Sequence, residues 1–346
     1  MEAVARRRTG ERLSIRMFPT FPGSDPTRTG DKLPARKQSC VGVEARLPPV
    51  ARESSEAGRG AAQRPTHRRS KPESQKEGEA HAMKILIVTP AYGRQVTVDY
   101  LLAVRALETS FRREGIASDL NFTIGASLPR SRNALASRVL HDESYTHLLF
   151  VDSDMSFRPE AVAKLVRSGK PLCGCIYPTR QLDYGQIQAA AREIADPVTA
   201  RDVGQTYVCL ENVMVVQGRD GPGLLIDGGL VRVDRLGLGI TLIHRSVLSA
   251  MRDAFPSLVL PGGADRAYVA MGAPFDILQV FESMADREGR FMGEDLSFAL
   301  RWTEGCGGEI WACVDEEIGH VGNAPFVGRA AERLRHLGLL GAEAWT

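Results

Sequence analysis

The sequence has 346 residues, of which 43% are hydrophobic, 25% charged and 6% aromatic, and its formal net charge is +2. Residues 1–82 hold 17 Lys and Arg against 10 Asp and Glu, whereas residues 83–346 hold 27 against 32. The slightly acidic main part argues against nucleic acid as a partner, because binding to its backbone needs a clustered basic face.

The composition also indicates where the protein works. No uncharged apolar run reaches the roughly 18 residues that a transmembrane helix needs, so we expect no transmembrane segment. The first residues lack the apolar core of a secretory signal. Six cysteines in a chain of this length do not suggest a disulfide scaffold. These features predict a cytoplasmic protein.

Residues 1–82 differ from the rest of the chain. They hold eight of the 19 prolines and show no sustained apolar periodicity. Such a segment buries too little apolar surface to offset the entropy lost on ordering, so we expect 1–82 to be disordered. It is either a basic arm that contacts an acidic partner or a stretch outside the real protein, with Met83 as the true start. We expect the folded domain over 83–325.

Strands and helices alternate from residue 83 onwards. The apolar run 85–88 predicts a buried strand, and apolar residues at helical spacing from Val98 predict a helix that stops at Gly115. A strand at 120–124, a helix at 129–140, a strand at 147–151, a helix from Pro159 and a strand at 171–176 follow. This order predicts an α/β fold with a parallel sheet and helices on both of its faces.

The later part of the chain is less regular. Apolar runs at 207–216, 224–233 and 239–243 predict mixed or antiparallel additions to the sheet. A helix over 294–303 and a strand over 309–314 are expected to close the domain. Residues 326–346 predict a C-terminal helical tail, with Leu334, Leu337 and Leu340 on one side.

Two carboxylates follow the predicted strand 147–151. Asp152 and Asp154 lie two residues apart, so an extended chain presents them on one face. In open α/β sheets the crevice beyond the carboxyl ends of the strands is the usual ligand site, and paired carboxylates there suit a hard divalent cation. The simpler interpretation is a pair of turn-forming or helix-capping aspartates.

Six short motifs share an order and spacing that are typical of one protein family. They are Thr89-Pro90-Ala91-Tyr92, Ser131-Arg132-Asn133, Phe150-Val151-Asp152-Ser153-Asp154, the stretch from Gly237 to Arg245, Gly293-Glu294-Asp295 and Gly319-His320-Val321-Gly322. Together they resemble nucleotide-sugar glycosyltransferases of the GT-A fold, of the family-2-like and mannan-polymerase-like bacterial or phage type. The resemblance covers roughly residues 83 to 322 and implies a mixed, mainly parallel sheet flanked by helices.

The resemblance implies a donor site. Pro90, Ala91 and Tyr92 would form the pocket for the nucleotide base, and Arg132 and Asn133 would contact the nucleotide or its diphosphate. Asp152 would lie near the ribose and the metal, Asp154 would bind the metal, and His320 would complete the ligand set. An imidazole beside two carboxylates favours Mn²⁺ over Mg²⁺. Simpler interpretations are a partly buried Tyr92, a surface Arg132 and an ordinary surface or hydrogen-bonded His320.

The motif Gly293-Glu294-Asp295 opens a predicted helix. Acidic residues in a first turn complement the helix dipole, which is the simpler interpretation. The resemblance implies that Asp295 is the general base for the acceptor hydroxyl and that Glu294 orients the acceptor or supports the base. The turn Tyr177-Pro178-Thr179-Arg180 follows a predicted strand, and it either bounds the donor sugar or is only a turn.

The expected function is metal-dependent transfer of a hexose from a nucleoside diphosphate-sugar to a hydroxyl of a carbohydrate, lipid-linked or protein acceptor. One alternative is a nucleotidyltransferase, which expects a Gly-rich basic loop after the first strand; the stretch 89–94 is a poor version of it. The other is a non-catalytic module that binds a nucleotide-sugar or a carbohydrate and has no need of Asp295.

Overall fold

The computed structural model describes residues 83–125, 127–218, 221–286, 288–322 and 325–341. The predicted disorder of 1–82 therefore lies outside the described residues. Among the described residues, eight strands form the main sheet, in the order β2 (Ala117–Thr123), β1 (Lys84–Pro90), β3 (His147–Val151), β10 (Ile240–His244), β5 (Leu172–Cys175), β15 (Ile310–Cys313), β9 (Leu230–Val233) and β8 (Ile226–Asp227).

The main sheet is mixed. β1 pairs in parallel with β2 and β3, and β5 pairs in parallel with β15. β10 is antiparallel to both of its neighbours, β3 and β5, and β9 is antiparallel to β15 and β8. Six of these eight strands therefore run in one direction. The predicted fold class, an α/β protein with a mixed sheet, is confirmed.

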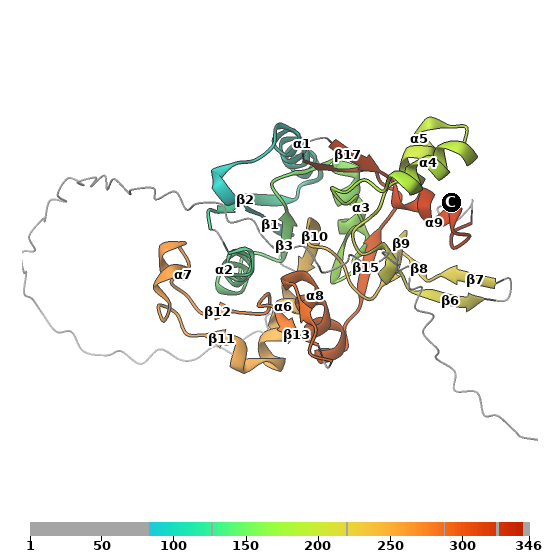
Figure 1. Cartoon of the computed structure of the whole chain (residues 1–346). Coiled ribbons are helices and arrows are strands. Elements are labelled where there is room, and N and C mark those ends of the chain that lie inside the picture. The colour runs from blue at the N-terminus through green and yellow to red at the C-terminus, as the bar shows by residue number, and fades with distance from the viewer. Residues whose placement is uncertain (1–82, 126, 219–220, 287, 323–324, 342–346) are drawn as a thin grey trace, which may run out of the picture. The chain divides into compact units, whose positions relative to one another are not determined.

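Two hydrophobic cores cover the two faces of this sheet. Side chains alternate along a strand, so neighbouring residues of β1 and β3 enter opposite cores. One face packs on α1 (Val98–Glu114) and α3 (Pro159–Ser168). The other packs on α2 (Leu128–His141), α6 (Arg245–Ala254) and α8 (Glu294–Leu300). Figure 1 shows α1 on one side of the sheet and α2 and α6 on the other.

Local sequence signals set the ends of the first two helices. The hydroxyl of Thr97 accepts a hydrogen bond from the backbone N–H of Tyr100 and caps α1. Gly115 ends α1 in the left-handed conformation, with φ of 73°, as the sequence predicts. Ser127 caps α2, and Pro129 lies in its first turn. Arg132 consequently lies early in α2, where the helix faces the carboxyl ends of β1 and β3.

Smaller elements surround the main sheet. β4 (Met155–Phe157), β16 (Ile318–Val321) and β17 (Pro325–Gly328) form a three-stranded sheet. The remaining strand pairs are β6 (Val215–Gly218) with β7 (Gly221–Leu224), β11 (Val259–Leu260) with β12 (Ile277–Leu278), and β13 (Met284–Ala285) with β14 (Phe291–Met292). The short helices are α7 (Arg266–Ala270), η1 (Tyr92–Arg94), η2 (Leu210–Asn212), η3 (Pro256–Leu258) and the π-helix η4 (Arg301–Gly305).

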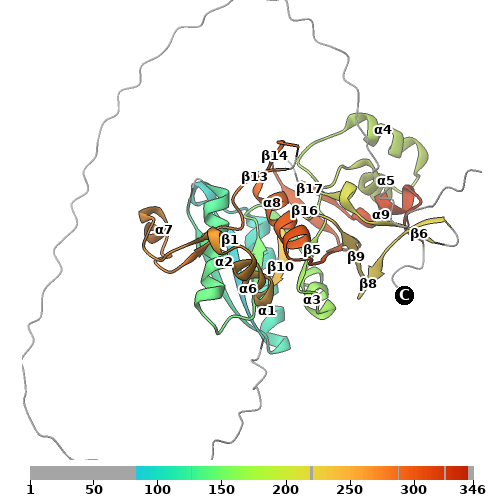
Figure 2. The ribbon, with the colours of Figure 1, turned by 90° about the horizontal axis from the view of Figure 1, so that it is seen from below.

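The C-terminal segment is part of the domain. Residues 325–328 form β17, which pairs with β16, so the expected boundary after residue 325 falls inside a strand. The helix α9 (Ala330–His336) is shorter than the expected tail, and its Leu334 is buried in the main core together with Leu340. Leu337 is 39% exposed. α9 packs on α5 (Pro197–Gly204), which packs on α4 (Tyr184–Glu193), and Figure 2 shows the three helices together.

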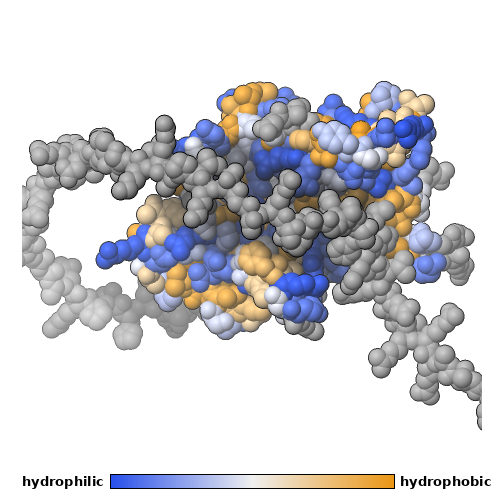
Figure 3. Space-filling model, viewed as in Figure 1, coloured by the Kyte–Doolittle hydropathy of each residue, from blue (hydrophilic) through white to orange (hydrophobic). Residues whose placement is uncertain are grey.

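Some large hydrophobic side chains remain exposed. Several lie in the first turns of α1 and in the adjacent loops, including Tyr92, Val98 and Leu102, which are 76%, 70% and 65% exposed. Figure 3 shows hydrophobic surface at the upper edge, where Figure 1 places α1. No helix in the described part of the chain is long and apolar enough to cross a bilayer.

Candidate functional site

The loop that carries the two predicted carboxylates is fixed by three other segments. The backbone N–H of Asp152 donates to the carbonyl of Gly239, 2.9 Å away, just before β10. The carbonyl of Ser153 accepts from the N–H of Thr97, at the start of α1, and the carbonyl of Asp154 accepts from the N–H of Val321, in β16. The loop at the end of β3 is therefore held in place by segments from distant parts of the chain.

Arg132 lies between two of the predicted site carboxylates. Its side chain is only 2% exposed, and its Nη2 atom donates to both carboxylate oxygens of Asp152, at 2.9 and 3.1 Å. On its other side, the Nε atom lies 3.6 Å from Oε1 of Glu294. The guanidinium also lies 5.0 Å from the centre of the Phe150 ring. One buried cation thus joins the end of β3 to the beginning of α8.

The electrostatics of this cluster depend on burial. Burial raises the pKa of Asp152, Arg132 opposes the rise, and the neighbouring Asp154 adds to it. Burial also raises the pKa of Glu294, again against the effect of Arg132, while Asp295 and Asp152 raise it further. Both carboxyls consequently have pKa values above their ordinary ones. Raised carboxyl pKa values in a charged cluster are typical of functional sites.

Asp154 belongs to a second group of charges. Its Oδ2 atom accepts a hydrogen bond of 2.8 Å from Nη1 of Arg180 and lies 3.5 Å from Nε2 of His320. Burial alone would raise the pKa of Asp154, but His320 and Arg180 together bring it below its ordinary value. The Nδ1 atom of His320 lies 2.9 Å from the carbonyl oxygen of Pro178, so Nδ1 donates and Nε2 faces Asp154.

Two of the three predicted metal ligands lie side by side. Asp154 Oδ2 and His320 Nε2 are a carboxylate and an imidazole, a donor set that divalent transition metals accept, and 3.5 Å lies within the span that two ligands of one ion leave between them. The third predicted ligand, Asp152, is hydrogen-bonded to Arg132. In the described part of the chain, no group of three or more His, Cys, Asp or Glu side chains is arranged to hold a metal.

The predicted nucleotide-binding residues have different environments. Pro90 ends β1 and is half-buried, Ala91 is buried, and Tyr92, in η1, is 76% exposed. Asn133 is fully buried, its amide donates to Glu282, and its carbonyl oxygen accepts from the N–H of Phe281. The structure therefore gives no support to a direct contact between Asn133 and a nucleotide.

The predicted acidic pair opens α8. Gly293 is the residue before the helix, and Glu294 and Asp295 lie in its first turn, where both are half-buried. Glu294 faces Arg132, as described above. The Oδ1 atom of Asp295 accepts from the N–H of Leu296 at 2.7 Å. The two side chains therefore differ in partners: Glu294 is paired with a buried cation, and Asp295 has only a backbone partner among the described residues.

Tyr177 explains two glycines that precede β10. It is buried, and its hydroxyl accepts a hydrogen bond from the N–H of Gly239 at 3.2 Å. A β-carbon on Gly237 would lie 2.6 Å from this hydroxyl, and one on Gly239 would lie 2.6 Å from the ring carbon that bears it. These glycines let the backbone cross the tyrosine ring, and the carbonyl of Leu238 between them lies 3.5 Å from Nη1 of Arg132.

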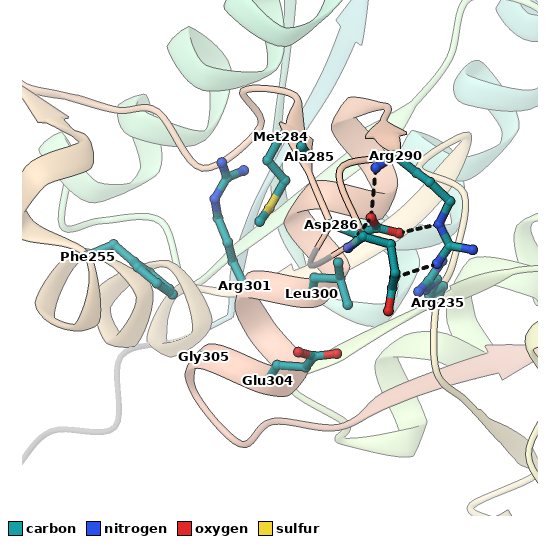
Figure 4. A pocket seen from close by; sticks show the side chains of 11 residues that line it. Arg235, Phe255, Met284, Ala285, Asp286, Arg290, Leu300, Arg301, Glu304 and Gly305 are labelled. Atoms are coloured by element: carbon teal, nitrogen blue, oxygen red, sulfur yellow. Dashed lines mark hydrogen bonds and ion pairs between the residues drawn. The ribbon is translucent and has the colours of Figure 1, made fainter. Parts of the chain in front are cut away.

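A cavity of about 520 Å³ lies beside the C-terminal end of α8 (Figure 4). Its walls come from the hairpin β13–β14, the end of α8, η4 and Arg235. The hairpin is attached to α8, because the N–H of Met284 donates to the hydroxyl of Ser297. Within it, Arg290 forms ion pairs with Asp286 and Glu288 at 2.7 and 2.9 Å. The cavity is therefore lined by both charged and apolar groups, and its wall on α8 is Leu300 at the end of that helix.

Comparisons with known proteins add two distant structures. No protein-family model matches the chain, and no curated protein matches it in sequence. The solved structures that match include A197 from STIV, at 15% identity and a TM-score of 0.34, over 69% of this chain and 86% of that one. They also include a glycosyltransferase involved in the glycosylation of the major capsid of PBCV-1, at 12% identity and a TM-score of 0.24, over 50% of this chain and 65% of that one. Likenesses at these scores do not define a family or a substrate.

Two features of the site are not evident in the sequence. Arg180 lies in a segment that reads equally well as a simple turn, and only the fold brings it to Asp154. Glu282 follows a buried stretch without any motif, yet it holds Asn133 and so fixes the beginning of α2. The sequence singles out the turn that contains Arg180 but does not indicate its partner, and Glu282 has no sequence signal, because each residue acts through a contact across more than 25 residues of chain.

Proposed function

We propose that the protein is a glycosyltransferase that moves a sugar, of the hexose type, from a nucleoside diphosphate-sugar to a hydroxyl acceptor. The observation that carries the proposal is the convergence of four charged side chains from three segments beyond the carboxyl end of β3: Arg132 of α2, Asp152 and Asp154 of the loop after β3, and Glu294 of α8. That end of an α/β sheet is where ligands usually bind. His320, from β16, joins them beside Asp154.

The donor would lie over the end of β3. The exposed ring of Tyr92 would stack on the nucleotide base, and the carboxylate of Asp152, oriented by Arg132, would accept hydrogen bonds from the ribose. Asp154 and His320 would hold the cation, with Mn²⁺ favoured over Mg²⁺ because one of the ligands is an imidazole. A divalent cation bound there would neutralise the departing diphosphate, so that this leaving group need not be protonated.

The acceptor would enter from the cavity beside α8. Its hydroxyl oxygen would attack the anomeric carbon, the bond from that carbon to the diphosphate would break, and the electron pair would leave with the diphosphate. The hydroxyl proton would pass to the carboxylate of Asp295. Glu294, held by Arg132, would keep the first turn of α8 in position. The cavity of about 520 Å³ gives room for a carbohydrate unit, whether free, lipid-linked or attached to a protein.

Donor hydrolysis tests this proposal. Purified protein with Mn²⁺ is incubated with UDP-sugars, GDP-sugars and other activated sugars, and the release of nucleoside diphosphate is followed. We expect release from one donor class, and we expect Asp154→Ala to remove metal-dependent donor binding. Asp99→Ala, on the exposed first turn of α1, is the matched control and should bind and react like the wild type. Donor binding that is unchanged in Asp154→Ala would contradict the metal assignment.

A thermal-shift series separates this function from a purely binding role. Nucleoside diphosphates raise the melting temperature of any protein that binds them in the folded state. If they do so with Mn²⁺ but no activated sugar is turned over in the presence of carbohydrate acceptors, the chain is a binding module. If nucleoside triphosphates and sugar phosphates give pyrophosphate instead, it is a nucleotidyltransferase.

A further inference from the structure

One oxygen atom of Asp154 faces two nitrogen atoms. Its Oδ2 accepts from Arg180 Nη1 at 2.8 Å and lies 3.5 Å from His320 Nε2. Arg180 is 51% exposed, whereas the side chains of Asp154 and His320 are 22% and 15% exposed. The arginine thus reaches this oxygen from the solvent side, while the histidine is fixed from within the protein.

The ring of His320 cannot turn away easily. Its Nδ1 donates to the carbonyl oxygen of Pro178, and the ring stands edge-on to Tyr177, with centroids 5.4 Å apart. A metal-binding histidine usually donates its other ring N–H to a carbonyl or carboxylate in this way, which fixes the tautomer. The Nε2 atom of His320 therefore faces the same oxygen that Arg180 contacts.

We propose that Arg180 is a positioning residue that exchanges Asp154 for the donor diphosphate when a divalent cation binds. The inference rests on the proposed metal-dependent transfer, in which Arg180 has no assigned role. Before the cation binds, the guanidinium and His320 together stabilise the negative charge of Asp154 in its partly buried place. Afterwards, the cation takes Oδ2, and the guanidinium is released.

The exchange follows from repulsion between the two positive charges and from the short distance to the diphosphate. A cation at Oδ2 and a guanidinium 2.8 Å from the same atom would repel each other, which favours release of the guanidinium. A diphosphate oxygen bound to that cation would lie about 2 Å from it. The phosphate group would then be the nearest anion for the released arginine, and arginine binds phosphate oxygens in a bidentate manner. The released side chain would strengthen donor binding.

The exchange predicts opposite effects on two ligands. Because a half-exposed ion pair contributes little, loss of Arg180 should tighten binding of Mn²⁺ alone by only about two- to fivefold. Loss of a charge-assisted contact to phosphate should weaken binding of a nucleoside diphosphate by about tenfold or more in the presence of Mn²⁺. A residue with a purely structural role would not shift the two affinities in opposite directions.

The test is a calorimetric titration of the full chain with MnCl₂, followed by titration with UDP and GDP at saturating Mn²⁺. Arg180→Gln is compared with the wild type and with Arg192→Gln, a matched change at an exposed arginine of α4. We expect tighter Mn²⁺ binding and weaker nucleotide binding in Arg180→Gln only. An unchanged affinity for either ligand overturns the exchange. If Asp154→Ala leaves Mn²⁺ binding unchanged both in the wild type and in Arg180→Gln, the proposed metal site is wrong, and the exchange is wrong with it.

Discussion

The Nε atom of Arg132 and the Oε1 atom of Glu294 lie 3.6 Å apart and connect the beginning of α2 to the beginning of α8. The same guanidinium donates to Asp152 at the end of β3. Because the arginine is almost completely buried, it is a charge that the fold accepts only with both carboxylates in place. Arg132 is therefore a structural requirement of the site, whatever it contacts in a ligand.

Replacing Arg132 by methionine should destabilise the protein. The change leaves Asp152 and Glu294 without their counter-ion, and since both are partly exposed we expect a loss of about 2–4 kcal/mol. The loss should shrink at pH 5, because protonation of the carboxyls, whose pKa values are raised by burial, removes the unpaired charges. Urea denaturation at pH 5 and at neutral pH measures this loss of stability.

Arg130→Met provides the control for Arg132→Met. Arg130 lies on the same helix and forms an ion pair of 3.3 Å with Asp265, in which both side chains are about a third exposed or more. An exposed pair of this kind contributes under about 1 kcal/mol, so the control should lose little stability. Equal losses in the two variants would show that Arg132 is not the centre of the cluster.

Asp295 and Glu294 can be distinguished by kinetics. We expect Asp295→Asn to lower kcat by about 10²-fold or more while the affinity for nucleoside diphosphate is unchanged, because loss of a general base affects the proton transfer and leaves donor binding intact. Glu294→Gln should instead weaken the hold of Arg132 and lower both thermal stability and donor affinity. Steady-state kinetics and calorimetry on both variants provide the comparison.

The pH dependence of the rate checks the same assignment. A general base must be deprotonated, so the rate falls as the pH drops through its pKa. Burial raises the pKa of Glu294, so if Glu294 is the base, the fall begins at a higher pH than an ordinary carboxyl would give. A fully active Asp295→Asn with such a profile would transfer the base role to Glu294.

The glycines before β10 should resist enlargement. A β-carbon on Gly239 would lie 2.6 Å from the Tyr177 ring, so Gly239→Ala must displace a buried aromatic side chain, at a cost of about 1–3 kcal/mol. Gly223→Ala, in β7, is the control, because nothing lies within 4 Å of its β-carbon. Thermal denaturation gives the melting temperatures of both variants. Equal melting temperatures would contradict the close packing of Gly239 on Tyr177.

Local signals in the sequence predict most of the main sheet. The apolar runs of β1, β3 and β5 and the caps of α1 and α2 are properties of neighbouring residues, so pattern alone finds them. No element is predicted from the sequence at α6, although its buried residues Val247, Leu248 and Met251 recur at helical spacing. The predicted boundary at residue 325 is wrong, since pairing of β17 with β16 depends on contacts that a local pattern does not contain.

For the candidate site, the sequence predicts several of the residues but not their contacts. Motif order brings Arg132, Asp152 and Glu294 to attention, and these residues do lie together. Motif order does not say which partner each side chain takes. Asn133, next to Arg132, points in a different direction from α2 and is hydrogen-bonded to Glu282, because successive residues of a helix point about 100° apart. Arg180 and Tyr177 gain their roles from tertiary contacts alone.

Acid stability should depend on a histidine at the end of β3 opposite to the site. His147, at the start of β3, stands edge-on to His244 of β10, with ring centroids 4.8 Å apart. Burial, with a smaller effect of His244, lowers the pKa of His147 to about 4 from its ordinary 6.5. Between these two pH values the unfolded chain binds a proton that the folded chain does not, so stability must fall as the pH drops through that window.

His147→Gln should therefore flatten the pH profile of stability. One proton changes the slope by at most about 1.4 kcal/mol per pH unit, and this contribution should disappear in the variant between pH 6.5 and pH 4. Above pH 7 the histidine is neutral in both states, so the two profiles should run parallel there, and that range is the internal control. Urea midpoints measured from pH 4 to pH 8 give both profiles. Parallel profiles over the whole range would mean that His147 takes up its proton in the folded protein as readily as in the unfolded chain, and that its place between β3 and β10 is open to water.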